Sequence, residues 1–211
     1  MRRNSPRFCI DAAGWASGAA RMPSPNFDRR SQDEDGEDAP VSLLVIHNIS
    51  LPPGEFGGPY IADLFLNRLD FGAHPYFEQL RPLRVSAHFL IRRNGEVVQF
   101  VSAGDRAWHA GVSNFCGRER CNDFSIGIEL EGTDFVPFED AQYEALVALT
   151  AALQAAYPLQ HVAGHEHIAP GRKTDPGPFF EWSRYEADYR RLCAQDEKSG
   201  IAHADLRFHA L

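Results

Sequence analysis

The feature that most constrains the fold is an apolar, β-branched run at residues 41–47, VSLLVIH, followed at once by a Pro/Gly-rich loop. A run of this length and composition is typical of a buried central strand. Strands are also expected at 86–91 and 97–101, because Asn94-Gly95 between them is a strong hairpin turn signal. These segments predict a sheet that begins near residue 41 and forms the centre of the fold.

Helices are expected to alternate with the remaining strands. Segment 60–69 predicts a short helix, and Asp140 is expected to cap a longer one. A last helix is expected at 181–193, with strands at 125–130 and 161–165. The order indicates an α/β or α+β single domain with helices on the faces of one sheet. The expected buried face of the helix over 141–156 consists of Ala141, Leu146, Leu149, Ala152, Leu153 and Ala156.

Length and charge restrict the function classes. A chain of 211 residues is enough for one well-buried domain. Its net charge of -8 argues against bulk attraction to nucleic acid or an anionic membrane. There is no apolar run of about 18 residues, and no signal peptide is expected after Met1, because Pro6, Arg7 and Asp11 interrupt the first segment. These features predict a cytoplasmic protein whose 4 scattered cysteines are free thiols.

Three regions are expected along the chain. Residues 1–40 form an N-terminal extension that ends in an acidic loop and packs on the domain. Residues 41–193 form the domain itself. Residues 194–211 are weakly patterned and are expected to form a partly flexible tail.

Two histidines and an aspartate are candidate metal ligands. His47 ends the first buried strand, His165 ends the last one, and Asp175 follows in a Pro/Gly-rich loop. Two imidazoles and a carboxylate leave a fourth tetrahedral position open, as a hydrolytic zinc requires. The spacing alone is equally compatible with hydrogen-bonded histidines. It also leaves competitors, namely His88, His109 and His167, the last lying two residues from His165 on strand-like sequence.

Carboxylates and a lysine could complete such a centre. Strand alternation places Glu129 and Glu131 on one face, where one of them could hold the proton of an attacking water. The competing interpretation is a pair of exposed strand carboxylates. Lys173 lies two residues before Asp175, where a cation could stabilise an oxyanion. The competing interpretation there is a solvated loop residue.

Five long phrases, taken together, closely resemble one family. They resemble the AmpD-type 1,6-anhydro-N-acetylmuramyl-L-alanine amidases, within the N-acetylmuramoyl-L-alanine amidase superfamily that includes peptidoglycan recognition proteins. The resemblance covers about residues 14 to 190, and the phrases occur in the family's order. The phrases are LLVIHNISLPPGEFGG (43–58), RVSAHFLIRRNGE (84–96), RAWHAGVS (106–113), GRERCNDFSIGIELEGTD (117–134) and GHEHIAPGRKTDPGP (164–178).

The resemblance implies a mixed β-sheet packed against helices, with a zinc cleft at one edge. It makes His47, His165 and Asp175 the Zn²⁺ ligands. It makes Glu129 and Lys173 the catalytic residues, with Glu131 as a structural partner. The residue after Glu166 is His167, where relatives often carry Asp, so the surroundings of the metal are expected to differ here.

The resemblance also implies a substrate with a carboxylate-rich peptide stem. Arg84 and Arg120 match arginines that are expected to grip those carboxylates. Asn48, Trp108 and His109 are expected to line the same groove.

The function that the resemblance implies is zinc-dependent hydrolysis of the amide between (1,6-anhydro-)N-acetylmuramic acid and L-alanine during cell-wall recycling, which would lower β-lactamase-inducing muropeptides. The expected partner is an anhydro-muropeptide, and the expected state is a monomer. Three alternatives stay open: an amidase acting on intact periplasmic peptidoglycan, a non-catalytic peptidoglycan-binding protein, and a structural zinc protein.

Overall fold

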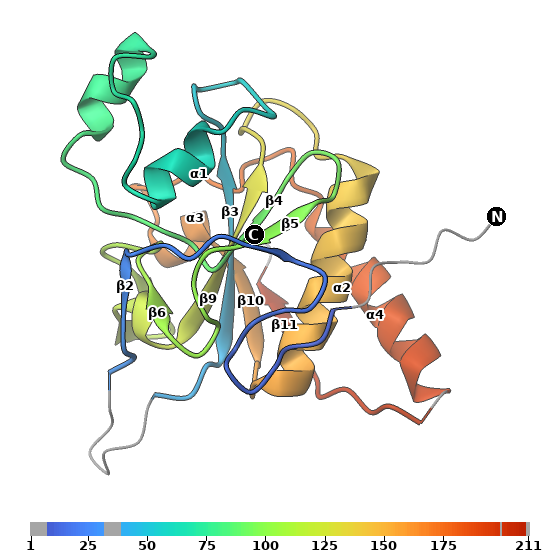
Figure 1. Ribbon diagram of the computed structural model, residues 1–211. Helices are drawn as coiled ribbons and strands as arrows, with labels where there is room; N and C mark the ends of the chain where they lie inside the picture. The colour runs from blue at the N-terminus through green and yellow to red at the C-terminus, as the bar shows by residue number, and fades with distance from the viewer. Residues whose placement is uncertain (1–7, 32–38, 199, 210–211) are drawn as a thin grey trace.

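A seven-stranded mixed sheet forms the centre of the computed structural model, which describes residues 8–31, 39–198 and 200–209 (Figure 1). Neighbouring strands are parallel except for the antiparallel pair β4 and β5. The predicted α/β fold with one mixed sheet is confirmed. In spatial order the strands are β1 (Ala20–Arg21), β5 (Val97–Gln99), β4 (Phe89–Ile91), β9 (Ser125–Glu131), β3 (Leu43–Ile49), β10 (His161–Gly164) and β11 (Arg207–His209).

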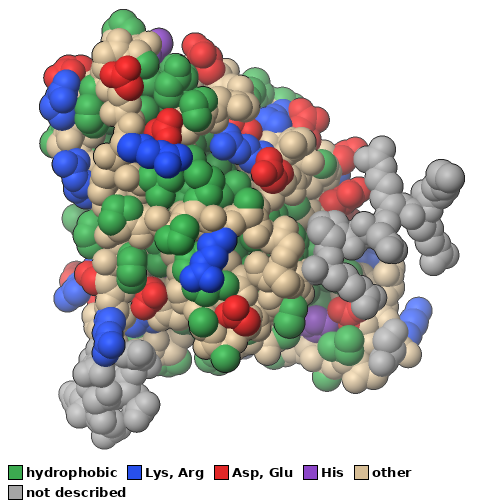
Figure 2. Space-filling model, in the orientation of Figure 1, with side chains coloured by type: hydrophobic (Ala, Val, Ile, Leu, Met, Phe, Trp, Pro, Cys, Tyr) green, Lys and Arg blue, Asp and Glu red, His purple; other side chains and the backbone are tan. Residues whose placement is uncertain are grey.

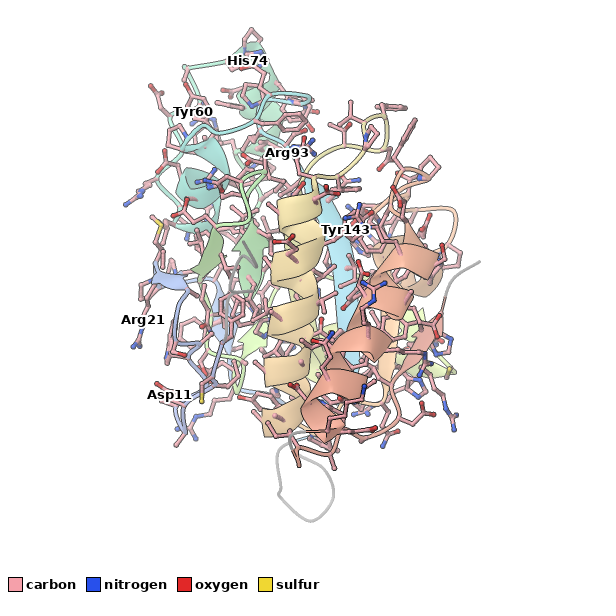
Figure 3. All side chains as sticks on the ribbon, turned by 90° about the vertical axis from the view of Figure 1, so that its right-hand side faces the viewer. Asp11, Arg21, Tyr60, His74, Arg93 and Tyr143 are labelled. Carbon is pink, nitrogen blue, oxygen red and sulfur yellow. The ribbon has the colours of Figure 1, made fainter. Side chains whose placement is uncertain are left out.

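Two long helices, α2 (Asp140–Ala156) and α4 (Trp182–Glu197), lie side by side on one face of the sheet (Figure 1). Tyr143 projects from α2 toward α4 (Figure 3), and its hydroxyl accepts a hydrogen bond from the backbone N–H of Glu181 at 2.7 Å. The main apolar core lies between these helices and alternate residues of the central strands. These strand residues include Leu44, Ile46, Ile126, Ile128 and Leu130.

The other face of the sheet carries shorter elements. Helix α1 (Tyr60–Phe65) and a 3₁₀ helix (Pro75–Leu80) pack over β4 and β5, and helix α3 (His165–Ile168) packs beside β3. The intervening residues of β3 and β9 point to this face. In β9 they are Ser125, Gly127, Glu129 and Glu131, so a row that includes three polar side chains is buried here rather than exposed to solvent.

Smaller strands and a 3₁₀ turn complete this side. Strand β2 (Phe27–Asp28) pairs with β6 (Arg106–Ala107), and β7 (Asn114–Phe115) pairs with β8 (Arg118–Glu119). The turn Cys121–Asp123 leads directly into β9. This segment, 105–124, therefore covers the polar row of β9.

The start of α2 differs from the prediction by one residue. Its N-cap is Glu139 rather than Asp140, because Gln142 closes a reciprocal capping box with Glu139. The predicted buried face is right for Leu146, Leu149 and Leu153, but Ala141 and Ala152 are half-buried and Ala156 is exposed. The helix instead buries the polar residues Gln142 and Thr150, whose side chains are hydrogen-bonded.

Segments near both ends of the described residues take part in the sheet. Strand β1 pairs with β5, so residues 20–21 and the domain from residue 41 share one sheet. Most of the predicted acidic loop, residues 32–38, lies outside the described residues. At the other end α4 continues through Glu197, and β11 pairs in parallel with β10. The predicted end of the last helix at residue 193 is wrong, because α4 continues past it.

The surface charges and the cysteines agree with what the sequence predicts. Basic and acidic side chains are interspersed on the face shown in Figure 2. Across the described ranges, no helix has both the length and the apolar character needed to cross a bilayer. All four cysteines are unpaired, as predicted.

Candidate metal centre

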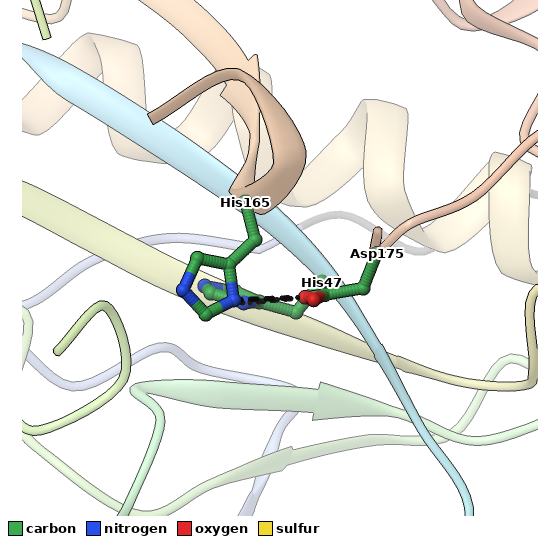
Figure 4. Close-up of side chains that lie close together, drawn as sticks. All are labelled: His47, His165 and Asp175. Atoms are coloured by element: carbon green, nitrogen blue, oxygen red, sulfur yellow. Dashed lines mark hydrogen bonds and ion pairs between the residues drawn. The ribbon is translucent and has the colours of Figure 1, made fainter. Parts of the chain in front are cut away.

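Three side-chain atoms from distant parts of the chain converge on one point (Figure 4). His47 comes from β3, His165 begins α3 directly after β10, and Asp175 lies in the following loop. The Nδ1 atoms of the two histidines lie 3.0 Å apart, and each is 3.0 Å from Oδ2 of Asp175. Both histidines are buried, and the carboxylate is half-buried.

The three atoms of this triangle are better explained as ligands of a cation than as partners in hydrogen bonds with one another. Each Nδ1 carries at most one hydrogen, so protons can satisfy only two sides of the triangle and the third side is repulsive. Three ligands at tetrahedral angles, about 2.0 Å from a zinc ion, would lie about 3.3 Å apart. Two imidazole nitrogens and a carboxylate oxygen are also a common donor set for a divalent transition metal. The residues therefore fit a metal ion.

The other ring nitrogens of the two histidines are hydrogen-bonded. Nε2–H of His165 donates to the carbonyl of Ala110 at 3.0 Å, and Nε2 of His47 lies 3.0 Å from Nδ1 of His109. Burial lowers the pKa of His47 to about 4, and the neighbouring carboxylate of Asp175, which favours the protonated imidazole, opposes this shift only in part. His47 is therefore neutral at pH 7, as a metal ligand must be.

Glu129 lies next to His47, because the two residues are register partners in the parallel strands β9 and β3. Its side chain is 9% exposed, and Oε2 has no hydrogen-bond partner among the described residues. Burial and the charge of Asp175 raise the pKa of Glu129, while Lys173 opposes the shift. A carboxyl with a raised pKa and an available oxygen is suited to exchanging protons with a reactant.

Glu131 has a different environment from Glu129, although both are buried and the exposed-pair alternative is wrong. Its carboxylate accepts hydrogen bonds from the backbone N–H groups of Gly57 and Arg93 at 2.7 and 3.1 Å. It also forms an ion pair with Arg92. Glu131 therefore joins the loop around residue 57 to the β4–β5 hairpin.

A cavity of about 700 Å³ opens beside the triangle. Asp175, Lys173, Phe56 and Phe135 are among the residues that line it. Phe135 is 82% exposed, which is unusual for a large aromatic side chain. Asn48 also lines the cavity, while its amide nitrogen donates to Asp134 at 2.6 Å and to the carbonyl of Pro176 at 3.0 Å.

The two candidate stem-binding arginines lie away from the triangle. Arg84 is exposed and donates to the carbonyls of Arg81 and Leu83. Arg120 is exposed, has a φ of 60°, and pairs with Asp123. Within the described ranges, no hydrogen bond or ion pair joins either arginine to the three converging residues.

Two further candidates lie on the segment that covers β9. Trp108 is half-buried, and its backbone N–H donates to Ser86 Oγ at 3.1 Å. His109 lies behind His47, since its ring contacts the Nε2 side of that imidazole rather than the converging side. Its contact with the groove stays a prediction.

The competing histidines do not join the triangle. The predicted strand ends at Gly164, and the helical turn α3 places His165 and His167 on different sides. Nδ1 of His167 accepts the backbone N–H of Gly164 at 2.8 Å, and its ring packs on Trp182. His88 is buried, accepts from the backbone N–H of Gly127 and donates to the carbonyl of Asp105.

Some contributing residues were not identified from the sequence. Arg172 donates to the carbonyls of Ala110 and Val112 at 2.7 and 2.6 Å, which fixes the segment beside His165. Asp134 holds Asn48 and contacts the turn at Gly177, where a Cβ atom would lie 2.6 Å from Asp134 Oδ1. Only the position of Arg172 next to Lys173 could have signalled such a role.

Comparisons with known proteins identify the family of the chain. A family profile described as N-acetylmuramoyl-L-alanine amidase matches residues 37–178. The chain belongs to the N-acetylmuramoyl-L-alanine amidase family. The amidase is 60% identical over 176 residues to the 1,6-anhydro-N-acetylmuramyl-L-alanine amidase AmpD of Salmonella typhimurium (strain SL1344), a match that covers 82% of this chain and 91% of the relative.

Solved structures give the same assignment. A crystal structure of a selenomethionine AmpD derivative superposes with a TM-score of 0.79 at 58% identity, covering 84% of this chain and 97% of that one. The amidase AmiD from E. coli, in complex with the substrate anhydro-N-acetylmuramic acid-L-Ala-D-γ-Glu-L-Lys, superposes with a TM-score of 0.53 at 30% identity. That match covers 84% of this chain and 73% of AmiD.

Proposed function

We propose that this amidase is a zinc enzyme that hydrolyses the amide between 1,6-anhydro-N-acetylmuramic acid and L-alanine in soluble anhydro-muropeptides. The observation that carries the proposal is the triangle of His47, His165 and Asp175 beside the buried carboxyl of Glu129. The names of the AmpD relatives and the ligand of the AmiD complex support the choice of bond and substrate.

Zinc is the metal we propose for the centre. Neutral imidazoles and one carboxylate leave an open coordination position in hydrolytic zinc sites. A zinc ion held by the three atoms would supply Lewis-acid activation of water and of the scissile carbonyl.

The chain's own residues carry the proton transfers. Glu129 accepts a proton from water as the water oxygen bonds to the lactyl carbonyl carbon. The ammonium of Lys173 stabilises the negative charge that develops on the carbonyl oxygen. Glu129 then delivers the proton to the L-alanine nitrogen as the C–N bond breaks, which releases the sugar acid and a free peptide.

The cavity beside Lys173 suits one end of such a substrate. Its rim combines the cations Arg172 and Lys173 with the exposed aromatic ring of Phe135. Arginine or lysine pairs with carboxylates, and an aromatic ring packs on the C–H face of a sugar. We propose that Arg84 and Arg120 contact the carboxylates of the peptide stem, and that the protein acts as a monomer in the cytoplasm.

The test is product analysis by mass spectrometry. Purified protein is incubated with 1,6-anhydro-N-acetylmuramyl-L-Ala-D-Glu-meso-diaminopimelate, with and without a chelator. The proposal predicts free tripeptide, whose release stops on chelation and returns with Zn²⁺. Cleavage of polymeric peptidoglycan without cleavage of the soluble substrate would assign the amidase to intact cell wall. Binding of the muropeptide without cleavage by zinc-loaded protein would make it a binding protein.

A further inference from the structure

We propose that His109 is a positioning residue that sets the ring tautomer of His47, so that the Nδ1 lone pair of His47 points to the metal position. This inference rests on the metal centre proposed above. Metal-binding histidines usually donate their second N–H to a carboxylate, a carbonyl or water. In this chain the acceptor for His47 is another imidazole, and that acceptor needs its own orientation.

Ser125 supplies the orientation. Its hydroxyl donates to the carbonyl of Cys121 at 2.6 Å, which uses its only hydrogen. Ser125 Oγ therefore accepts the Nε2–H of His109 across 3.3 Å. A neutral His109 that is protonated on Nε2 has a lone pair on Nδ1, which accepts the Nε2–H of His47 at 3.0 Å. The Nδ1 atom of His47 is then unprotonated and faces His165 and Asp175.

The sheet makes room for this imidazole. Gly127 lies in the middle of β9, between two buried isoleucines. A Cβ atom at position 127 would lie 2.4 Å from Cγ and 2.5 Å from Nδ1 of His109. A glycine inside a strand often marks such a close approach. The ring of His109 therefore fits only because residue 127 is a glycine, since any side chain there would overlap the ring.

The backbone of the same segment is fixed as well. The N–H groups of His109 and Ala110 both donate to Oδ1 of Asn122, at 3.2 and 2.8 Å. The carbonyl of Ala110 accepts the Nε2–H of His165. One dipeptide thus orients both metal histidines: His47 through the His109 ring, and His165 through the Ala110 carbonyl.

The first test is made on metal-free protein. Long-range ¹⁵N correlation spectra of histidine-labelled protein report which ring nitrogen carries the proton. We expect His47 to be protonated on Nε2, and S125A, which retains the His109 ring but removes its acceptor, to give a mixture of tautomers at His47. Protonation of His47 on Nδ1 in the wild-type protein, or an unchanged tautomer in S125A, would overturn the proposal.

The second test is zinc affinity, measured by competition with a chromophoric chelator. H109L should weaken zinc binding about 10- to 100-fold, while H109Q, whose amide offers both an acceptor and a donor, should restore most of it. H74L, which changes a half-buried histidine at the N-cap of the 3₁₀ helix, is the matched control. If H109L does not fold, as judged by circular dichroism, zinc affinity is measured on S125A instead. Wild-type zinc affinity in a folded H109L would overturn the proposal.

The two proposals fail in different ways. If the zinc centre is wrong, the wild-type protein does not bind zinc, and the tautomer measurement still tests His109. If only the role of His109 is wrong, zinc binds and the variants bind it equally well.

Discussion

His47 and Glu129 occupy paired positions on the neighbouring parallel strands β3 and β9. The pairing places the carboxyl group of Glu129 beside the imidazole that begins the metal triangle. Because both strands lie in the centre of the sheet, the distance between the two groups is set by backbone hydrogen bonds rather than by a mobile loop.

E129Q should lower kcat by about 10²- to 10⁴-fold, the usual contribution of a general acid–base group. Zinc should stay bound at the wild-type stoichiometry, because Glu129 is not part of the triangle. Turnover is measured by tripeptide release and zinc by atomic absorption. E144Q, which changes an exposed carboxylate of α2, is the control. Near-normal turnover in E129Q would reject the role of Glu129.

K173M should lower kcat by about 10²- to 10³-fold through loss of oxyanion stabilisation. The chain has a natural control in Lys198, an exposed lysine at the end of α4. Steady-state kinetics of K173M and K198M on the anhydro-muropeptide separate the two. A change in KM with unchanged kcat would show that Lys173 binds the substrate without acting in the reaction.

E131A should destabilise the fold by about 3–5 kcal/mol. The substitution leaves the guanidinium of Arg92 and the backbone N–H groups of Gly57 and Arg93 without their carboxylate partner. Urea denaturation measures the loss of unfolding free energy, with E96A on the exposed turn as the control. A loss below about 1 kcal/mol in E131A would mean that the loop at Gly57 is held by other contacts.

Acidification from pH 7.5 to 5.5 in the presence of a chelator should destabilise E129Q more than the wild-type protein. Burial keeps His47 and His88 neutral in the fold, with pKa values of about 4 and about 3, so the unfolded state takes up their protons first and stability falls. The raised pKa of Glu129 acts in the opposite direction, because the folded state takes up that proton first. E129Q removes this compensation.

Urea midpoints at the two pH values provide the measurement. The pH-dependent change should be larger in E129Q than in the wild-type protein. Equal changes in the two proteins would contradict the raised pKa of Glu129.

The sequence was sufficient for the elements that have strong local signals. The apolar run at 41–47 and the Asn94-Gly95 turn identify β3 and the β4–β5 hairpin, because burial and turn geometry leave few alternatives. Alternation correctly placed Glu129 and Glu131 on one face. It could not show that this face is buried, because the segment that covers it, 105–124, has only short and weakly patterned strands.

The site was predicted mainly through the resemblance to a family, not through spacing. His47 and Asp175 are 128 residues apart, so only the tertiary fold makes them neighbours. The short turn α3 is too brief to leave a helical period, which is why His165 was assigned to a strand. Gly127 and Ser125 have meaning only next to the His109 ring, and no local pattern indicates that contact.

The most direct test of the zinc centre is a zinc titration of metal-free protein, measured by peptide release from the anhydro-muropeptide. We expect no turnover without metal, a linear rise with added zinc, and saturation at one zinc per chain. D175N should show neither tight zinc binding nor turnover. Full activity in metal-free protein, or saturation at a different stoichiometry, would contradict a single zinc held by His47, His165 and Asp175.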